Sequence, residues 1–156
     1  MVIKPSQLES LDIFHRKSLR AFLSLSDHSP VPALYFIFAE LPMSAKIHRD
    51  TFALFYGIWQ NPNTTIHKVV KYLLQEAPDN SRTWSIYIRH LAKKYQLPDP
   101  LDLLNTAPMS KDSFKKLVTT KITAYHERHL CDRSSAHTEQ STQYRICPND
   151  NDSREP

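Results

Sequence analysis

The sequence predicts an all-α protein: a single helical domain of about six helices, followed by a disordered C-terminal tail. The 156 residues include one glycine, which is too few for the glycine-rich hairpin turns of an all-β fold. Apolar side chains recur at helical spacing, and most of the 11 prolines fall between the helical segments. We therefore expect one helical domain over residues 1–130 and a polar tail over residues 131–156.

The first helix is expected to run from Ser6 to about Leu25. Ser6 and Glu9 have the spacing of a capping box, which is typical of a helix start. The apolar residues that follow share one face at 100° per residue, so we expect that face to be buried. Its members are Leu8, Leu11, Phe14, Leu19, Phe22 and Leu25.

The segment from Pro30 to Trp59 is the most densely apolar part of the chain and predicts two central helices, over 32–40 and 44–59. Pro42 separates them. The first of the two is too short to span a bilayer and contains Glu40, so we expect a buried helix and no membrane partner. The second is amphipathic, and its apolar face contains Ile47, Leu54, Phe55, Ile58 and Trp59.

Three further helices are expected. The fourth helix is capped by Thr64 or Asn63 and ends near Glu76, the fifth runs from residue 80 or 81 to 95, and the last is capped by Ser110 and ends near Leu130, after a short apolar turn at 101–104. In the fourth helix the apolar face holds Ile66, Val69, Val70 and Leu73. From Cys131 onward, polar residues dominate and aliphatic side chains almost disappear, a composition typical of a disordered tail. Both cysteines lie in that tail, and no signal-peptide pattern opens the chain, so we expect an intracellular protein, in the nucleus or cytoplasm.

The charge pattern permits a nucleic-acid partner. Residues 1–130 carry 17 Lys and Arg against 11 Asp and Glu, whereas residues 131–156 carry 3 against 5. On the predicted fifth helix, Arg82, Arg89 and Lys93 fall within about 40° of one another, a spacing that suits phosphate contact. The same pattern is typical of an ordinary solvated helix face, and the residues alone leave both interpretations open.

The sequence contains no convincing catalytic or metal site. With one glycine, the chain cannot form a P-loop or a dinucleotide-binding fingerprint. His126, His129 and Cys131, followed by His137 and Cys147, have a superficial zinc pattern, but the paired short spacings of a zinc site are missing. We therefore expect no cofactor, no metal and no catalytic residues.

Several short segments, in order along the chain, resemble one protein family. They are His15–Arg20, Pro32–Tyr35, Glu40–Pro42, Lys46–Asp50, Asn80–Trp84 and Tyr95–Leu101. Together they resemble the region that follows the polymerase palm in the reverse-transcriptase polyproteins of non-LTR (LINE-type, jockey-like) retrotransposons. The resemblance extends from about Leu8 to Leu130.

This resemblance implies a fragment of a larger RNA-directed DNA polymerase, made of thumb-like and connector helices. The Asp-Asp metal motif of the palm and the endonuclease have no counterpart in this sequence. The resemblance therefore implies no enzyme activity, and a supporting role in which the chain binds RNA or DNA by its phosphate backbone, beside the remainder of a reverse transcriptase. The residues implied in phosphate contact are Arg16, Lys17 and Arg20 on the first helix and Arg82, Arg89 and Lys93 on the fifth.

The sequence departs from the family at two positions. The family usually has glycine before Glu-Leu-Pro and between Tyr and Leu-Pro, where this chain has Ala39 and Gln96. If those glycines serve turns with positive φ, the backbone is expected to be strained here.

The alternative is a helical protein–protein interaction domain, or a purely structural one, that binds no nucleic acid. Reversal of Arg82, Arg89 and Lys93 to glutamate is expected to separate the two possibilities. It should abolish nucleic-acid binding under the first and leave folding intact under both.

Overall fold

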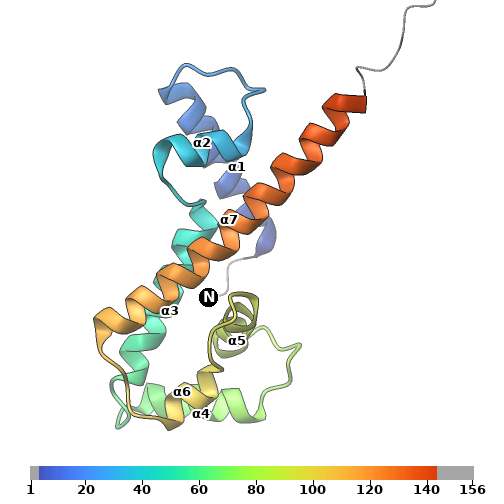
Figure 1. The fold of residues 1–156 in the computed structure, drawn as a ribbon. Coiled ribbons are helices and arrows are strands. Elements are labelled where there is room, and N and C mark those ends of the chain that lie inside the picture. Colours follow the sequence, from blue (N-terminus) through green and yellow to red (C-terminus); the bar gives the residue numbers. More distant parts are fainter. Residues whose placement is uncertain (1–3, 144–156) are drawn as a thin grey trace, which may run out of the picture.

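The computed structural model describes the backbone of residues 4–143, and within it every side chain except those of residues 36 and 130–143. This part of the chain is helical and contains no strand, so the all-α prediction is confirmed. The predicted apolar turn at 101–104 is itself a short helix, α6. The helices are α1 (Pro5–Phe22), α2 (Val31–Phe38), α3 (Met43–Trp59), α4 (Thr65–Glu76), α5 (Trp84–Lys94), α6 (Pro100–Asn105) and α7 (Lys111–Gln143) (Figure 1).

Two long helices, α3 and α7, pack along each other and connect the two ends of the molecule (Figure 1). At one end, α1 packs on α2 and α3, and α2 also contacts α7. At the other end, α4, α5 and α6 pack together, and both α4 and α5 contact α3.

The core is centred on the aromatic side chains of α3. The Tyr56 ring stacks on Phe114 of α7 at 5.2 Å between centroids, and the Trp59 ring meets the same phenylalanine edge-on at 5.7 Å. The indole N–H of Trp59 donates to the carbonyl of Thr106 at 2.9 Å, and the Tyr56 hydroxyl donates to the carbonyl of Met109 at 2.9 Å. These two bonds fix the connection between α6 and α7 while the rings fill the interior.

The start of α1 differs from the prediction. The N-cap is Lys4 rather than Ser6, and Pro5 occupies the first helical turn, where its fixed φ and missing N–H are favourable. The backbone N–H of Lys4 donates to the side-chain oxygen of Gln7 at 3.0 Å, so Gln7 takes the role expected of Glu9.

The buried faces of three helices also differ from the prediction. On α1, Phe14 is 69% exposed and Phe22 is 80% exposed, so most of the expected apolar face is uncovered. On α3, Leu54 is exposed, whereas the polar residues His48 and Thr51 are buried. The reason is that α3 packs on four other helices, and the positions of these neighbours decide which side chains are covered. On α4, Ile66 and Val69 are exposed, and the buried residues are His67, Val70 and Leu74.

The last helix is longer than predicted. It was expected to end near Leu130, but α7 continues to Gln143. The rest of the predicted tail, residues 144–156, lies outside the described part of the chain.

Three helices end in the same way, with a non-glycine residue in the left-handed region. Ser24 follows α1 with φ 52°, Ala39 follows α2 with φ 48°, and Gln96 follows α5 with φ 54°. In each case the next N–H bonds to the carbonyl five residues earlier: Leu25 to Arg20 at 2.9 Å, Glu40 to Tyr35 at 3.1 Å and Leu97 to Ala92 at 2.9 Å. This is the Schellman motif, whose left-handed position is usually glycine. The expected strain at Ala39 and Gln96 is therefore present in the backbone.

We predict that Ala39→Gly and Gln96→Gly each stabilise the protein. A side chain in the left-handed region costs roughly 1–2 kcal/mol, and the extra unfolded-state entropy of glycine offsets part of the gain. The free energy of unfolding, measured by chemical denaturation, should rise by about 0.5–1 kcal/mol for each variant.

The matched control is Ala53→Gly, on an exposed position inside α3. There φ is helical, so glycine should lower the free energy of unfolding by about 1 kcal/mol. A loss of stability at Ala39 or Gln96 similar to that at Ala53 would contradict the prediction.

Within residues 4–143, none of the helices combines the length and the apolar character needed to cross a membrane.

Candidate nucleic-acid interface

The three residues predicted on α1 lie in different environments. Lys17 is exposed, and Arg16 is half-buried at the wall of a cavity between α1, α2 and α7. Arg20 donates to the backbone carbonyl of Ser29 at 2.8 Å, so its guanidinium already holds the loop between α1 and α2. Of this group, Lys17 is the residue most available to a phosphate.

The predicted stripe Arg82, Arg89 and Lys93 does not form a continuous helix face. The hydroxyl of Thr83 accepts the N–H of Ile86, so α5 begins at Trp84 and Arg82 lies in the preceding loop. The expectation of one stripe was wrong because the local cap starts the helix later than periodicity suggests. Arg82 and Lys93 are both exposed.

Arg89 has an internal role instead. Its guanidinium donates to the carbonyl of Leu74 and lies 3.3 Å from a carboxylate oxygen of Asp79 and 3.7 Å from one of Asp99. It thereby connects α4, α5 and the loops before α5 and α6. Reversal of Arg89 to glutamate would place a carboxylate against two others, so we no longer expect that change to leave folding intact.

The structure brings together cations from two distant segments that were not among the predicted site residues. Arg49 of α3 and Lys111 and Lys115 of α7 line a groove of about 340 Å³ between these helices, which we call the α3–α7 groove. Its floor is apolar and includes Phe52, Tyr56, Phe114 and Val118. Asp50 also lines the groove and lies 3.8 Å from the Arg49 guanidinium.

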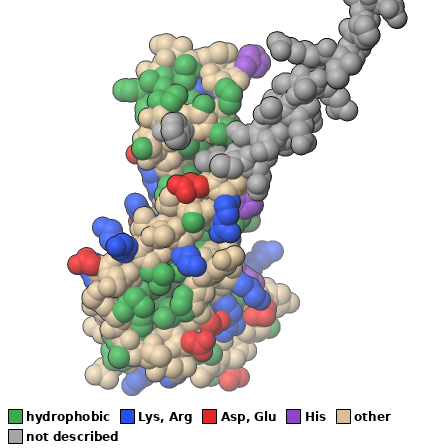
Figure 2. Space-filling view, in the orientation of Figure 1, with side chains coloured by type: hydrophobic (Ala, Val, Ile, Leu, Met, Phe, Trp, Pro, Cys, Tyr) green, Lys and Arg blue, Asp and Glu red, His purple; other side chains and the backbone are tan. Residues whose placement is uncertain are grey.

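The lysines of α7 extend this basic surface. Lys111, Lys115 and Lys116 are exposed, and Lys121 is half-buried. Within the described residues none of these four lies within ion-pair distance of a carboxylate, so their charges remain available. Figure 2 shows that basic side chains lie beside hydrophobic surface and are spread over this face rather than gathered in one patch. The spacing of Lys111 and Lys115 indicates one helix face, but only the packing of α3 on α7 adds Arg49.

A polar cluster connects α3, the end of α5 and α7. The Tyr95 hydroxyl lies 2.6 Å from Nδ1 of His48 and 3.4 Å from Nε2 of His126, so it can donate to one ring and accept from the other. Burial, reinforced by the nearby Lys94 ammonium, lowers the pKa of both histidines to about 4. Both rings are therefore neutral near pH 7 and add no charge to a phosphate site. We call these three residues the His48–Tyr95–His126 cluster.

Lys94 joins this cluster to the surface. Its ammonium lies 5.3 Å from the centroid of the Tyr95 ring and 5.0 Å from that of Tyr125, within the range of cation–π contacts. Burial lowers the pKa of Lys94.

In the part of the chain that the structure describes, no three His, Cys, Asp or Glu side chains come together in a group that could hold a metal ion. The side chains of Cys131 and His137 lie outside the described set, as does Cys147.

Comparison of the chain with protein-family models, with curated proteins and with solved structures gives no match.

Proposed function

We propose that this domain is a non-catalytic, nucleic-acid-binding part of a LINE-type reverse transcriptase, corresponding to thumb-like and connector helices. The observation that carries the proposal is the backbone at Ala39 and Gln96, with φ of 48° and 54°. These are the two positions at which the resembling family usually has glycine. A left-handed turn is the physical reason for glycine at such a position, so turns of this type account for the glycines of the family pattern.

The motif residues around these turns make contacts that suit a shared architecture. Glu40, directly after the left-handed Ala39, forms an ion pair with Lys46 across the Pro42 turn. Leu97, directly after Gln96, packs against the core. Three of the six segments that carry the resemblance lie at helix ends, and the other three lie within α1, α2 and α3. The three at helix ends are Glu40–Pro42, Asn80–Trp84 and Tyr95–Leu101.

The proposed ligand is the phosphate backbone of RNA or DNA. Phosphate binding needs cations held on rigid elements and free of internal ion pairs. Lys17, Lys111 and Lys115 lie on helices and form no ion pair with another described residue. Arg49 faces the same groove as the two α7 lysines. The proposal assigns no reaction to this chain, and the remainder of a reverse transcriptase would supply the chemistry.

We predict that reversal of Arg49, Lys111 and Lys115 to glutamate abolishes most nucleic-acid binding. Each lost phosphate contact should reduce the slope of log affinity against log salt by about 0.9 for a duplex, so the slope should fall by about 2 to 3. The measurement is fluorescence anisotropy with a labelled RNA hairpin and a DNA duplex, at two or more salt concentrations.

The matched control is Lys68→Glu, which reverses an exposed lysine on α4. It should leave the salt slope unchanged, and circular dichroism should show that both variants remain helical. A wild-type protein that is helical and monodisperse but binds neither ligand would contradict the proposed function.

A second candidate function is supported by the exposed apolar side chains of α1 and α2. Phe14, Phe22 and Ile37 are largely exposed, and Figure 2 shows hydrophobic side chains gathered on this end of the molecule. Uncovered apolar surface of this kind is typical of a protein–protein interface. A helical interaction or structural domain is therefore the alternative if nucleic-acid binding is absent.

A further inference from the structure

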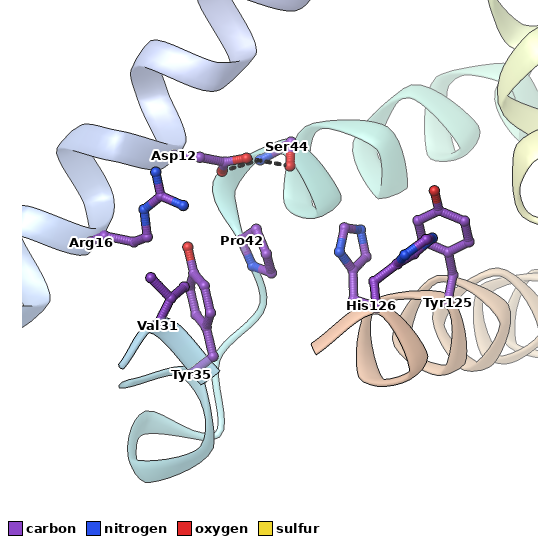
Figure 3. A pocket seen from close by; sticks show the side chains of 9 residues that line it. Asp12, Arg16, Val31, Tyr35, Pro42, Ser44, Tyr125 and His126 are labelled. Atoms are coloured by element: carbon purple, nitrogen blue, oxygen red, sulfur yellow. Dashed lines mark hydrogen bonds between the residues drawn. The ribbon is translucent and has the colours of Figure 1, made fainter. Parts of the chain in front are cut away.

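A cavity of about 320 Å³ lies where α1, α2, the start of α3 and α7 meet (Figure 3). This volume is near the lower end of the range for small-ligand pockets, roughly 300–1,000 Å³. Residues from four different helices or helix starts line it, so its shape depends on the tertiary fold and could not be predicted from any one segment.

One wall of the cavity offers an acceptor and a donor side by side. Asp12 accepts the backbone N–H of Ser44 at 2.9 Å and the Ser44 hydroxyl at 2.7 Å, which fixes the carboxylate in place. Each carboxylate oxygen keeps a second lone pair, so Asp12 can still accept from a ligand. Arg16, one turn further along α1, lines the same wall and supplies N–H donors (Figure 3).

A third polar group in this wall is the hydroxyl of Tyr35. Tyr35 is 4% exposed, and its hydroxyl forms no hydrogen bond within the described structure. The hydroxyl points toward Arg16 and Asp12 (Figure 3). A buried hydroxyl without a partner costs roughly 1–3 kcal/mol, so a ligand that satisfies it would recover part of that cost.

The opposite wall is aromatic. Tyr125, His126 and His129 of α7 face the cavity, and the rings of Tyr125 and His129 meet at 4.3 Å between centroids. Flat faces of this type stack on planar heterocycles.

The charge of the cavity argues against a bare phosphate as the ligand. The charges of Asp12 and Arg16 oppose each other, and burial keeps His126 neutral near pH 7 by lowering its pKa to about 4. A phosphate dianion would gain little electrostatic attraction here, because it would lie close to the Asp12 carboxylate as well as to Arg16. A neutral planar molecule with both donors and acceptors on its edge fits both walls.

We infer that this cavity binds a nucleobase, by stacking on the α7 rings and by hydrogen bonds to Asp12, Arg16 and Tyr35. The base can belong to a free nucleoside or to an unpaired nucleotide of a bound single strand. The second source rests on the proposed function, because the strand must first be held by its phosphates.

The test uses the whole chain and the Tyr35→Phe variant, with Tyr72→Phe as the matched control on the exposed surface of α4. Affinity is measured by fluorescence anisotropy for single-stranded oligonucleotides of one base type and for an abasic strand of the same length. Wild type and Tyr72→Phe should bind at least one base-bearing strand more tightly than the abasic strand. Tyr35→Phe should lose about 3- to 10-fold in affinity for that strand alone, which corresponds to one hydrogen bond. Because Tyr35→Phe removes a hydroxyl that has no hydrogen-bond partner among the described residues, the fold of the variant should be unaffected.

Two outcomes separate this inference from the proposed function. Salt-dependent binding of abasic and base-bearing strands with equal affinity would overturn the nucleobase cavity and leave phosphate binding in place. Binding of neither strand would contradict the proposed function. The cavity would then be tested by itself, by titrating the protein with nucleosides and with inorganic phosphate and following the NMR signals of His126 and His129. Shifts with a nucleoside that weaken in Tyr35→Phe would support it, and shifts with phosphate only, or with neither ligand, would overturn it.

Discussion

Trp59→Ala is expected to lower the free energy of unfolding by about 3–5 kcal/mol, the largest effect of any single substitution proposed for this chain. The side chain is 2% exposed and contacts both Tyr56 and Phe114, so its removal opens a cavity at the junction of α3 and α7. It also leaves the Thr106 carbonyl without its donor. Domains of this size are stable by about 5–15 kcal/mol, so the variant should unfold at a much lower denaturant concentration.

Leu54→Ala is the informative control for that prediction. Leu54 lies on the same helix, and its sequence periodicity also predicts burial, but it is 67% exposed in the structure. Its truncation should change the free energy of unfolding by less than about 1 kcal/mol. If Leu54→Ala were as destabilising as Trp59→Ala, the packing of α3 described here would be incorrect.

The contrast between Trp59 and Leu54 shows which features of the fold sequence periodicity could predict and which it could not. The apolar periodicity and the prolines between the periodic segments identified the helices, because both signals are local in the sequence. Periodicity could not identify the covered face of a helix with several neighbours, since α3 packs on α1, α4, α5 and α7 at once. On α1 the failure has the opposite cause: within the described residues, too few helices pack on it to cover Phe14 and Phe22.

Helix ends were predicted unevenly for a related reason. The positions of Ala39 and Gln96 were identified through a family pattern, and both have positive φ. The start of α5 was misplaced because Ser81 and Thr83 are both plausible caps, and only the observed hydrogen bond from Ile86 distinguishes them. Because α5 begins at Trp84 rather than at residue 80 or 81, Arg82 lies outside the helix and outside the predicted basic stripe.

The candidate site depended most on tertiary structure. Single-helix spacing could suggest Lys111 and Lys115, and it suggested Arg89 as well. It could not show that Arg89 forms ion pairs with Asp79 and Asp99, or that Arg49 lines the same groove as the α7 lysines. Such pairings join residues that are distant in sequence, so they follow from helix packing alone.

The second large effect is expected from acidification. His48 and His126 have folded-state pKa values of about 4, lowered first by burial, against an ordinary value near 6.5 in the unfolded chain. As the pH falls below 6.5 the unfolded chain takes up protons that the folded protein does not, so the free energy of unfolding decreases. The loss continues until the pH reaches the folded pKa near 4, below which these groups contribute no further change. For His48, which is almost fully buried, the total is roughly 3 kcal/mol. The contribution of His126 is smaller because its side chain is partly exposed.

The measurement is a series of denaturant unfolding curves between pH 7.5 and 5, where most carboxylates stay ionised. Wild-type stability should fall across this range, with a slope approaching about 1.4 kcal/mol per pH unit for each buried histidine. His48→Gln removes one titrating group, so the slope should decrease by nearly one such contribution whatever the stability of the variant at pH 7.5. His28→Gln, at an exposed turn residue, should leave the slope unchanged. A slope that is identical in wild type and His48→Gln would show that His48 is protonated as easily in the folded protein as in the unfolded chain, and that its burial does not keep the imidazole neutral.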